Sequence, residues 1–286
     1  MLGDGRKPQY DQQRVVLEAV VDLCRQPSFM ADMYTNYDCA LDGLNLFEDV
    51  CNLLSKNAFP VNCPLSAVHL LALEGLVTIV HTLAERTGDG GGGSTAAREA
   101  EGEPALAAYL EFWNEAMPSA AAEQAGWLRR RKAIKRQLTA AVEHFNRDVK
   151  KGLEFLRSLH LLPAEEEPTS VALFFRHCPG LDKNVVGEYL GDPKPHKVAV
   201  LEAYAASFDF AGLTIDASLR LFLEGFMLPG EAQKISRILE NFASVYYACS
   251  QATDGVVADA DSVYVLSYSI IMLNTDLHNK QVKCLY

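Results

Sequence analysis

Glu231 is the acidic residue with the most distinctive surroundings, because it directly follows a Pro–Gly pair in GFMLPGEAQKI (residues 225–235). Pro229 cannot continue the apolar helical pattern before it, and Gly230 permits backbone angles that a side chain would forbid. We therefore expect a new helix to begin near Glu231, where the first amides have no partner within the helix. A carboxylate there interacts favourably with the helix dipole, by about 0.3–1 kcal/mol when exposed. The spacing alone explains Glu231 as a first-turn acid and assigns it no further chemistry.

A second group of polar residues ends the stretch SYSIIMLNTDLHN (residues 267–279). Its first half is apolar, whereas nearly every residue from Asn274 to Asn279 is polar. Amides and hydroxyls at the end of an apolar helix could line a groove that binds another molecule. The same pattern also fits a buried helix that ends in a polar C-terminal cap. Both interpretations stay open on the pattern alone.

Composition excludes several classes of protein. The formal net charge of −11 argues against a general nucleic-acid role. The seven cysteines form no CxxC pair and do not cluster with the seven histidines, so we expect reduced, mostly buried thiols in a cytosolic protein. We expect no metal site, disulfide framework or cofactor. The N-terminus lacks the plan of a signal peptide, and without a GxSxG, HExxH or P-loop motif a hydrolytic enzyme has little support.

The elements that carry these residues are predicted to be helices throughout. Before residue 88, apolar stripes recur at helical spacing over residues 15–24, 46–54 and 70–80. After residue 126, prolines and glycines divide the chain into helices of roughly ten to twenty residues. No strand-like alternation occurs, so we expect an all-α protein built from many short helices.

A glycine-rich segment, GDGGGGS at residues 88–94, divides the chain. Together with the Ala/Glu-rich residues that follow, it predicts a flexible linker, with a helix possible over residues 104–117. We therefore expect a helical region over residues 1–87, the linker over residues 88–126, and a second helical domain over residues 127–286.

Two segments allow both a binding role and a structural role. Residues 129–136 carry six arginines and lysines, which could bind anionic lipid or an acidic partner. The regular apolar spacing of the surrounding helix favours the other interpretation, that these residues form a solvated face.

Residues 65–83 are the longest apolar run, interrupted by His69, Glu74 and His81. They predict a buried helix of a soluble domain rather than a membrane span.

Two stretches resemble the signature motifs of the Sec-seven domain, the guanine-nucleotide exchange module for Arf GTPases. They are LFLEGFMLPGEAQKI (residues 221–235) and LSYSIIMLNTDLHN (residues 266–279). The similarity extends over residues 141–163 and 180–192. Residues 35–60 resemble the homology region upstream of this domain in the large Golgi-type factors of the GBF/GNOM branch. The resemblance implies a right-handed array of short helices, preceded by part of the helical upstream region.

The resemblance also implies roles for individual residues. Glu231 matches the glutamic finger, which enters the nucleotide site of a GDP-bound Arf GTPase and promotes GDP release. Met272 and Asn279 fall where the family contacts the GTPase. The protein would then regulate a GTPase rather than act as an enzyme itself, in vesicle traffic, as a cytoplasmic protein held peripherally on Golgi or endosomal membranes.

Two further groups of residues follow from the same resemblance. Tyr268, Ser269 and Met272 match the pattern of members whose complex with the GTPase is trapped by brefeldin A. A four-residue box of the upstream region is expected to support contact between domains rather than exchange: Asn36, Tyr37, Asp38 and Cys39.

The sequence departs from the family pattern in two respects. Met227 stands where the family usually has arginine. The chain also begins inside the upstream region and ends soon after Asn279, where the family domain continues with further helices, so we expect a product truncated at both ends. The alternative function is therefore a helical fragment that binds membrane-traffic partners without catalysing exchange.

Overall fold

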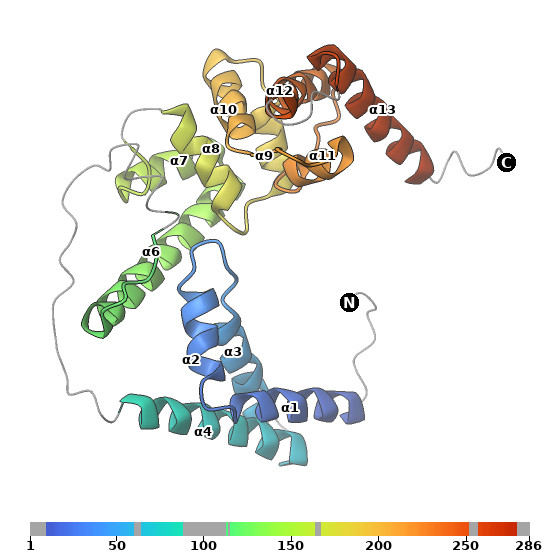
Figure 1. Ribbon diagram of the computed structural model, residues 1–286. Coiled ribbons are helices and arrows are strands. Elements are labelled where there is room, and N and C mark those ends of the chain that lie inside the picture. The colour runs from blue at the N-terminus through green and yellow to red at the C-terminus, as the bar shows by residue number, and fades with distance from the viewer. Residues whose placement is uncertain are drawn as a thin grey trace. The chain divides into compact units, whose positions relative to one another are not determined.

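The computed structural model describes residues 10–59, 64–87, 113, 115–163, 167–251 and 257–278. Every regular element within these ranges is a helix, which confirms the predicted all-α class (Figure 1). The chain divides into two compact units. Unit 1 comprises Met1–Ala100 and Ala116–Arg136, and unit 2 comprises Glu101–Glu115 and Gln137–Tyr286. One boundary therefore falls inside a helix, α6 (Ala121–Arg147), and the division into three segments that the sequence suggested stays a prediction.

Unit 1 is built around the three helices that the apolar stripes predict, α1 (Tyr10–Cys24), α3 (Leu46–Ala58) and α4 (Ala67–Thr87). Between α1 and α3 lie two short elements, α2 (Phe29–Met33) and the π-helix η1 (Tyr34–Asp38). Helices α1 and α3 both pack on α4. Their shared core contains Val21, Leu54 and Ala72, all fully buried.

The prediction that the apolar run of residues 65–83 forms a buried helix was wrong for one face of α4. Val68, Ala72 and Ile79 face the core, whereas Val77 and Val80 are 60% and 67% exposed. The reason is that α1 and α3 cover only one side of the helix. Within the described ranges, Ala67–Glu85 is the one helical stretch long and apolar enough to cross a membrane, which by itself is weak evidence for a span.

In the residues that the structure describes, unit 2 contains the end of α6 and seven further helices. They are α7 (Val149–Ser158), α8 (Pro168–His177), α9 (Lys183–Leu190), α10 (Pro195–Ala206), α11 (Ile215–Leu223), α12 (Ala232–Gln251) and α13 (Ala260–His278). Pro168 and Pro195 open α8 and α10, at the helix position where a missing N–H leaves no hydrogen bond unmade. Helix α8 packs on α10, and α12 packs on α13.

An aromatic cluster forms the core of unit 2 beside α11 and α12. The ring of Phe222 is fully buried and lies 5.3 Å from Phe242, 5.7 Å from Tyr204 and 5.6 Å from Phe226. Such pairs contribute about 0.5–1.5 kcal/mol beyond the burial of their area. The cluster therefore provides a rigid base for the segment between α11 and α12, which carries Glu231.

Candidate functional site

Glu231 lies at the N-terminal end of α12. The helix begins at Ala232, and the carbonyl of Glu231 accepts hydrogen bonds from the amides of Lys234 (3.0 Å) and Ile235 (3.1 Å). This confirms that a helix begins near Glu231. The Glu231 side chain is 69% exposed, so its carboxylate is presented to solvent at the helix end.

The loop that leads to Glu231 is held by α9. The amide of Met227 donates to the carbonyl of Lys183 (2.9 Å). The Met227 carbonyl oxygen approaches Gly187 so closely that a Cβ at this glycine would overlap it. Pro229 is buried, and a Cβ at Gly191 would lie 3.1 Å from its Cγ. The loop therefore rests on Gly187 of α9 and on Gly191, the residue that caps this helix.

The glycine that the loop requires is Gly187 rather than Gly230. Gly230 does not use the backbone freedom that glycine permits, since it has no positive φ and a Cβ there would meet no atom within 4 Å. The motif analysis assigned no role to Gly187, because the contact joins residues forty positions apart and leaves no local pattern in the sequence.

A lysine compensates the charge of Glu231. The ammonium of Lys234 lies 2.9 Å from Glu231 Oε1 and 2.6 Å from Glu188 Oε2. The hydrogen bonds that Lys234 donates to Glu188 and Glu231 raise the pKa of Lys234. Water and salt screen exposed pairs of this kind, so each contributes little to stability. Glu231 can therefore turn away while Lys234 stays paired with Glu188.

Helix α13 runs antiparallel to α12, toward the end that carries Glu231. The Tyr247 hydroxyl donates to the carbonyl of Ala258 (3.4 Å), and the hydroxyls of Ser236 and Tyr264 lie 3.0 Å apart. From Ala258 to Tyr264 the residue number rises into α13, whereas from Tyr247 to Ser236 it falls along α12. The two helices therefore run in opposite directions. Glu231 and the second half of α13 therefore lie at the same end of this helix pair.

The second half of α13 presents three of the residues singled out in the sequence. Ser269 and Met272 are exposed, and Tyr268 is half-buried with its ring 6.1 Å from that of Tyr264. Asn279 lies outside the described residues. Apolar side chains are exposed here too, namely Leu273 and Leu277. The interpretation of this stretch as a buried helix was therefore wrong, and its exposed, mixed surface is open to a binding partner.

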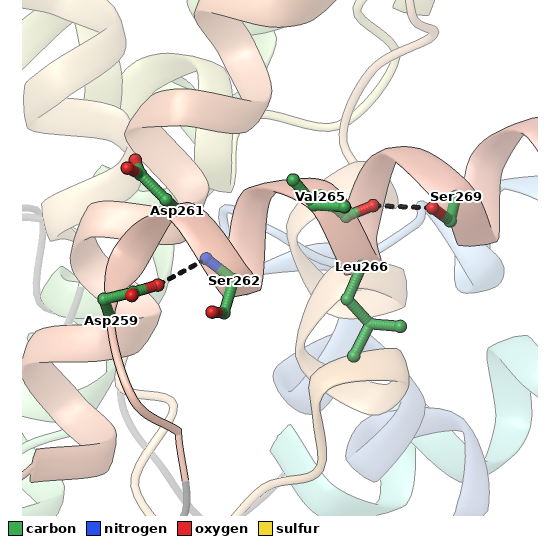
Figure 2. A pocket seen from close by; sticks show the side chains of 6 residues that line it. All are labelled: Asp259, Asp261, Ser262, Val265, Leu266 and Ser269. Carbon is green, nitrogen blue, oxygen red and sulfur yellow. Dashed lines mark hydrogen bonds between the residues drawn. The ribbon is translucent and has the colours of Figure 1, made fainter.

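The first half of α13 borders a hollow of about 470 Å³, shown in Figure 2. Its lining residues are Asp259, Asp261, Ser262, Val265, Leu266 and Ser269. Asp259 accepts a hydrogen bond from the amide of Ser262 (2.6 Å), and the bonds from Ser262 lower the pKa of Asp259. Ser269 donates to the carbonyl of Val265 (2.7 Å). These groups are already used within the helix, and across the part of the chain that is described no cluster could hold a metal ion.

Residues 36–39 lie in unit 1, where the side chains of two of them are exposed and those of the other two are buried. Asn36 and Tyr37 are exposed, whereas Asp38 and Cys39 are fully buried. The Asp38 carboxylate accepts hydrogen bonds from the amides of Phe47 (2.8 Å) and Glu48 (3.3 Å), in the first turn of α3. Asp38 therefore satisfies free amides at the N-terminus of α3, where a negative charge is also favoured by the helix dipole.

Asp38 also binds the basic run through Lys132 of α6. The three N–H donors of the Lys132 ammonium have three acceptors: Asp38 Oδ1 at 3.1 Å, Asn45 Oδ1 at 3.2 Å and Glu48 Oε2 at 3.3 Å. One buried cation thereby joins η1, the start of α3 and α6.

The prediction that the basic run forms a solvated face was wrong for half of it. Arg131, Lys132 and Lys135 are only 4–5% exposed. Lys135 donates to the carbonyls of Tyr37 (2.6 Å) and Leu44 (3.4 Å), and burial lowers its pKa. The physical reason is that a buried carboxylate and loop carbonyls, distant in the sequence, supply the acceptors that water would otherwise provide. Asp38 of unit 1 is therefore an acidic partner for the basic run of residues 129–136.

Comparisons with known proteins agree with these features. Residues 134–284 match the Sec7 domain family, and residues 1–46 match the family described as the Mon2/Sec7/BIG1-like HUS domain. The chain is 50% identical over 281 residues to the Arabidopsis thaliana ARF guanine-nucleotide exchange factor GNOM, covering 96% of this chain and 19% of that protein. It is 46% identical over 281 residues to the factor GNL1 of the same plant, covering 96% and 18%.

A solved structure of ARF1-GDP bound to a Sec7 domain complexed with brefeldin A is 43% identical in sequence. It matches with a TM-score of 0.47 and covers 52% of this chain and 73% of that chain. The chain spans about a fifth of the length of the curated relatives named above.

Gly187→Ala is expected to destabilise unit 2 by about 1–3 kcal/mol, because the new methyl group overlaps the Met227 carbonyl. Gly230→Ala is the matched control in the same loop and should be neutral or slightly stabilising. Urea unfolding followed by circular dichroism measures both. Equal stability of the two variants would contradict the proposed support of the loop by α9.

Asp38→Asn is expected to lower the free energy of unfolding by about 3–5 kcal/mol, because it leaves the buried ammonium of Lys132 without its buried anion. Glu48→Gln is the control, since Glu48 also contacts Lys132 but is 42% exposed, and should cost less than about 1 kcal/mol. With Trp113 replaced by Phe, the fluorescence of Trp127 on α6 reports the unfolding of unit 1 in urea. Similar losses for the two variants would show that burial of Asp38 is not what matters.

Proposed function

Because this chain belongs to the Sec7 domain family, in its GNOM-like branch as the sequence motifs predicted, we propose that it promotes GDP release from an Arf-family GTPase. Glu231 is the acting carboxylate in this proposal. The observation that carries it is the combination of an exposed acid at a helix end with a loop backbone that is closely packed against α9. The exchange factors named among its relatives add support.

The proposed chemistry is electrostatic. Bound GDP is held by Mg²⁺ and by a lysine of the GTPase on its phosphates. A carboxylate brought to that place repels the phosphate and competes for both cations. A 10⁴-fold acceleration of GDP release requires the activation free energy to fall by about 5.5 kcal/mol. One unscreened anion beside a phosphate in a site that excludes water supplies energy of that order.

The pairing of Lys234 fits this role. In the free protein its ammonium compensates Glu231, and Glu188 holds the same ammonium from α9. When Glu231 turns toward the nucleotide, Lys234 keeps Glu188 as a carboxylate partner, so the ammonium is not left unpaired. The acid is therefore released at small cost, because the bond that it gives up is exposed to water.

The exposed half of α13 is the proposed contact surface for the GTPase. Met272, Leu273 and Leu277 are 47%, 62% and 62% exposed and lie at the end of the helix pair that carries Glu231. Burying one such side chain contributes about 1.5–3 kcal/mol. Asn279, which lies outside the described residues, is proposed to contact the GTPase as well. Attachment to Golgi or endosomal membranes, and a role of residues 36–39 between domains, belong to the same proposal.

Glu231→Gln is expected to leave stability almost unchanged and to lower the exchange rate by orders of magnitude, because it removes the charge and keeps the shape. Glu231→Lys should bind the GDP-loaded GTPase and fail to release the nucleotide, since a cation attracts the phosphate. The measurement is release of a fluorescent nucleotide from a soluble Arf on addition of this chain.

Glu188→Gln is the matched control, because it removes the other carboxylate on Lys234 without touching the helix end. It should exchange within a few-fold of the original chain. Normal exchange by Glu231→Lys would overturn the role of Glu231. Binding of the GTPase without acceleration, already in the unmutated chain, would instead favour the alternative of a helical interaction fragment.

Met272→Leu is expected to preserve exchange and to weaken inhibition by brefeldin A. Tyr268, Ser269 and Met272 are proposed to contact the drug, and loss of the thioether changes the shape of an exposed site. A loss of about 1 kcal/mol corresponds to a roughly fivefold weaker inhibition. Leu273→Met is the neighbouring control and should leave inhibition unchanged. Full resistance of the unmutated chain to the drug would contradict this assignment.

A further inference from the structure

A cavity of about 470 Å³ lies between α8 and α10, and none of its lining residues belongs to the site proposed for exchange. It is lined by Thr169, Leu173, Arg176, His177, Ala203, Ala206 and Ser207. The residues from α8 recur at helical spacing, so one face of that helix forms one wall. From Thr169 to Arg176 the helix rises by about 10 Å, at 1.5 Å per residue. The cavity is therefore elongated, with small or apolar residues in the middle and polar groups toward both ends of this wall.

Arg176 is the charged group of the cavity. Its guanidinium carbon lies 4.0 Å from the centroid of the Phe208 ring, and Nη1 donates a hydrogen bond to Ser207 Oγ (2.9 Å). Within the described part of the chain it makes no ion pair with a carboxylate. Burial lowers the pKa of Arg176, because the charge has lost water without gaining an anion.

The hydrogen-bonding capacity of Arg176 is mostly unused. A guanidinium has five N–H donors, and the structure uses one of them, on Ser207. Ser207 donates its own proton to the carbonyl of Tyr204 (2.7 Å), so its oxygen remains an acceptor toward Arg176. The position of Arg176 in the last turn of α8 favours a cation and explains why the charge is tolerated here. The other N–H donors of Arg176 meet no acceptor among the residues that the structure describes.

The neighbouring groups suit the same kind of ligand. His177 lines the cavity next to Arg176, and its ring stacks on Trp113 at 5.7 Å. The hydroxyl of Thr169 lies on the same wall, and Leu173, Ala203 and Ala206 leave an apolar space between the polar ends. A guanidinium fork beside an imidazole matches the oxygens of a phosphate group.

We propose that this cavity is a binding site for a phosphate monoester, with the phosphate on Arg176 and His177 and an organic group over Leu173 and Ala203. The volume exceeds what a phosphate ion alone occupies, and the apolar middle section accounts for the organic part. A soluble phosphate ester and the headgroup of phosphatidic acid share this chemistry. The site is independent of the proposed exchange activity.

Fluorescence of Trp113 reports binding, because its ring stacks on a residue of the cavity. With Trp127 replaced by Phe, the chain is titrated with inorganic phosphate, with phenyl phosphate and with sodium chloride at matched ionic strength. Phenyl phosphate should bind roughly tenfold more tightly than inorganic phosphate, because its ring buries apolar surface. Chloride should give no saturable change.

Two variants test the site and one controls for charge. Arg176→Met keeps an apolar side chain on Phe208 and should weaken phenyl phosphate binding by roughly tenfold or more. Ala206→Leu narrows the cavity at an exposed position, keeps every charge and should weaken binding too. Arg220→Gln removes an exposed arginine of α11 that does not line the cavity and should bind normally. Circular dichroism checks that each variant is folded.

The source of the phosphate is tested with vesicles of phosphatidylcholine, with and without phosphatidic acid, in a sedimentation assay. Saturable binding of phenyl phosphate that Arg176→Met and Ala206→Leu both weaken supports the site with a soluble ligand. Binding confined to phosphatidic acid vesicles, and weakened by the same two variants, supports the site with a lipid headgroup. Binding that is unchanged in Ala206→Leu, or no binding to any probe, would overturn the proposal.

Discussion

The close approach of the Met227 carbonyl to Gly187 is the contact on which the position of Glu231 depends. A helix end can present an acid to solvent without any support, but the acid then moves with its loop. Here the loop backbone is bonded to Lys183, packed against Gly187 and anchored by buried Pro229. Because Met227 makes these contacts through its backbone N–H and carbonyl, they do not depend on its side chain, which is 55% exposed. A methionine there is compatible with the same loop geometry.

The aromatic cluster around Phe222 completes this support from the other side of the loop. Phe226 belongs both to the cluster and to the segment that ends at Glu231. The carboxylate is thus attached to a core that resists deformation, while its own side chain is exposed and bonded only to a lysine that has another partner. A rigid backbone and a releasable side chain are the combination that an inserting acid requires.

Three basic side chains show how the acceptors around a cation decide its role. Lys132 is buried, and each of its N–H donors meets an oxygen, so it joins elements of unit 1. Lys234 is shared by two exposed carboxylates, so it can lose one. Arg176 has an aromatic ring and one hydroxyl but no carboxylate in the described chain, so it favours an anion from outside. Formal charge is equal in all three, and the acceptors around each cation differ.

The amino-acid sequence by itself determined the helical class, the helix start at Glu231 and the resemblance of residues 221–235 and 266–279 to the motifs of an exchange domain. These features are local, since the apolar period and the break at Pro229 act on residues close in the chain. Tertiary structure alone decided the burial of Lys132 and Lys135, the exposure of one face of α4 and the need for glycine at position 187. Each of these depends on acceptors, covering helices or carbonyls contributed by segments distant in the sequence. Such partners leave no periodic signal beside the residue that they affect, because they are set by how whole helices pack.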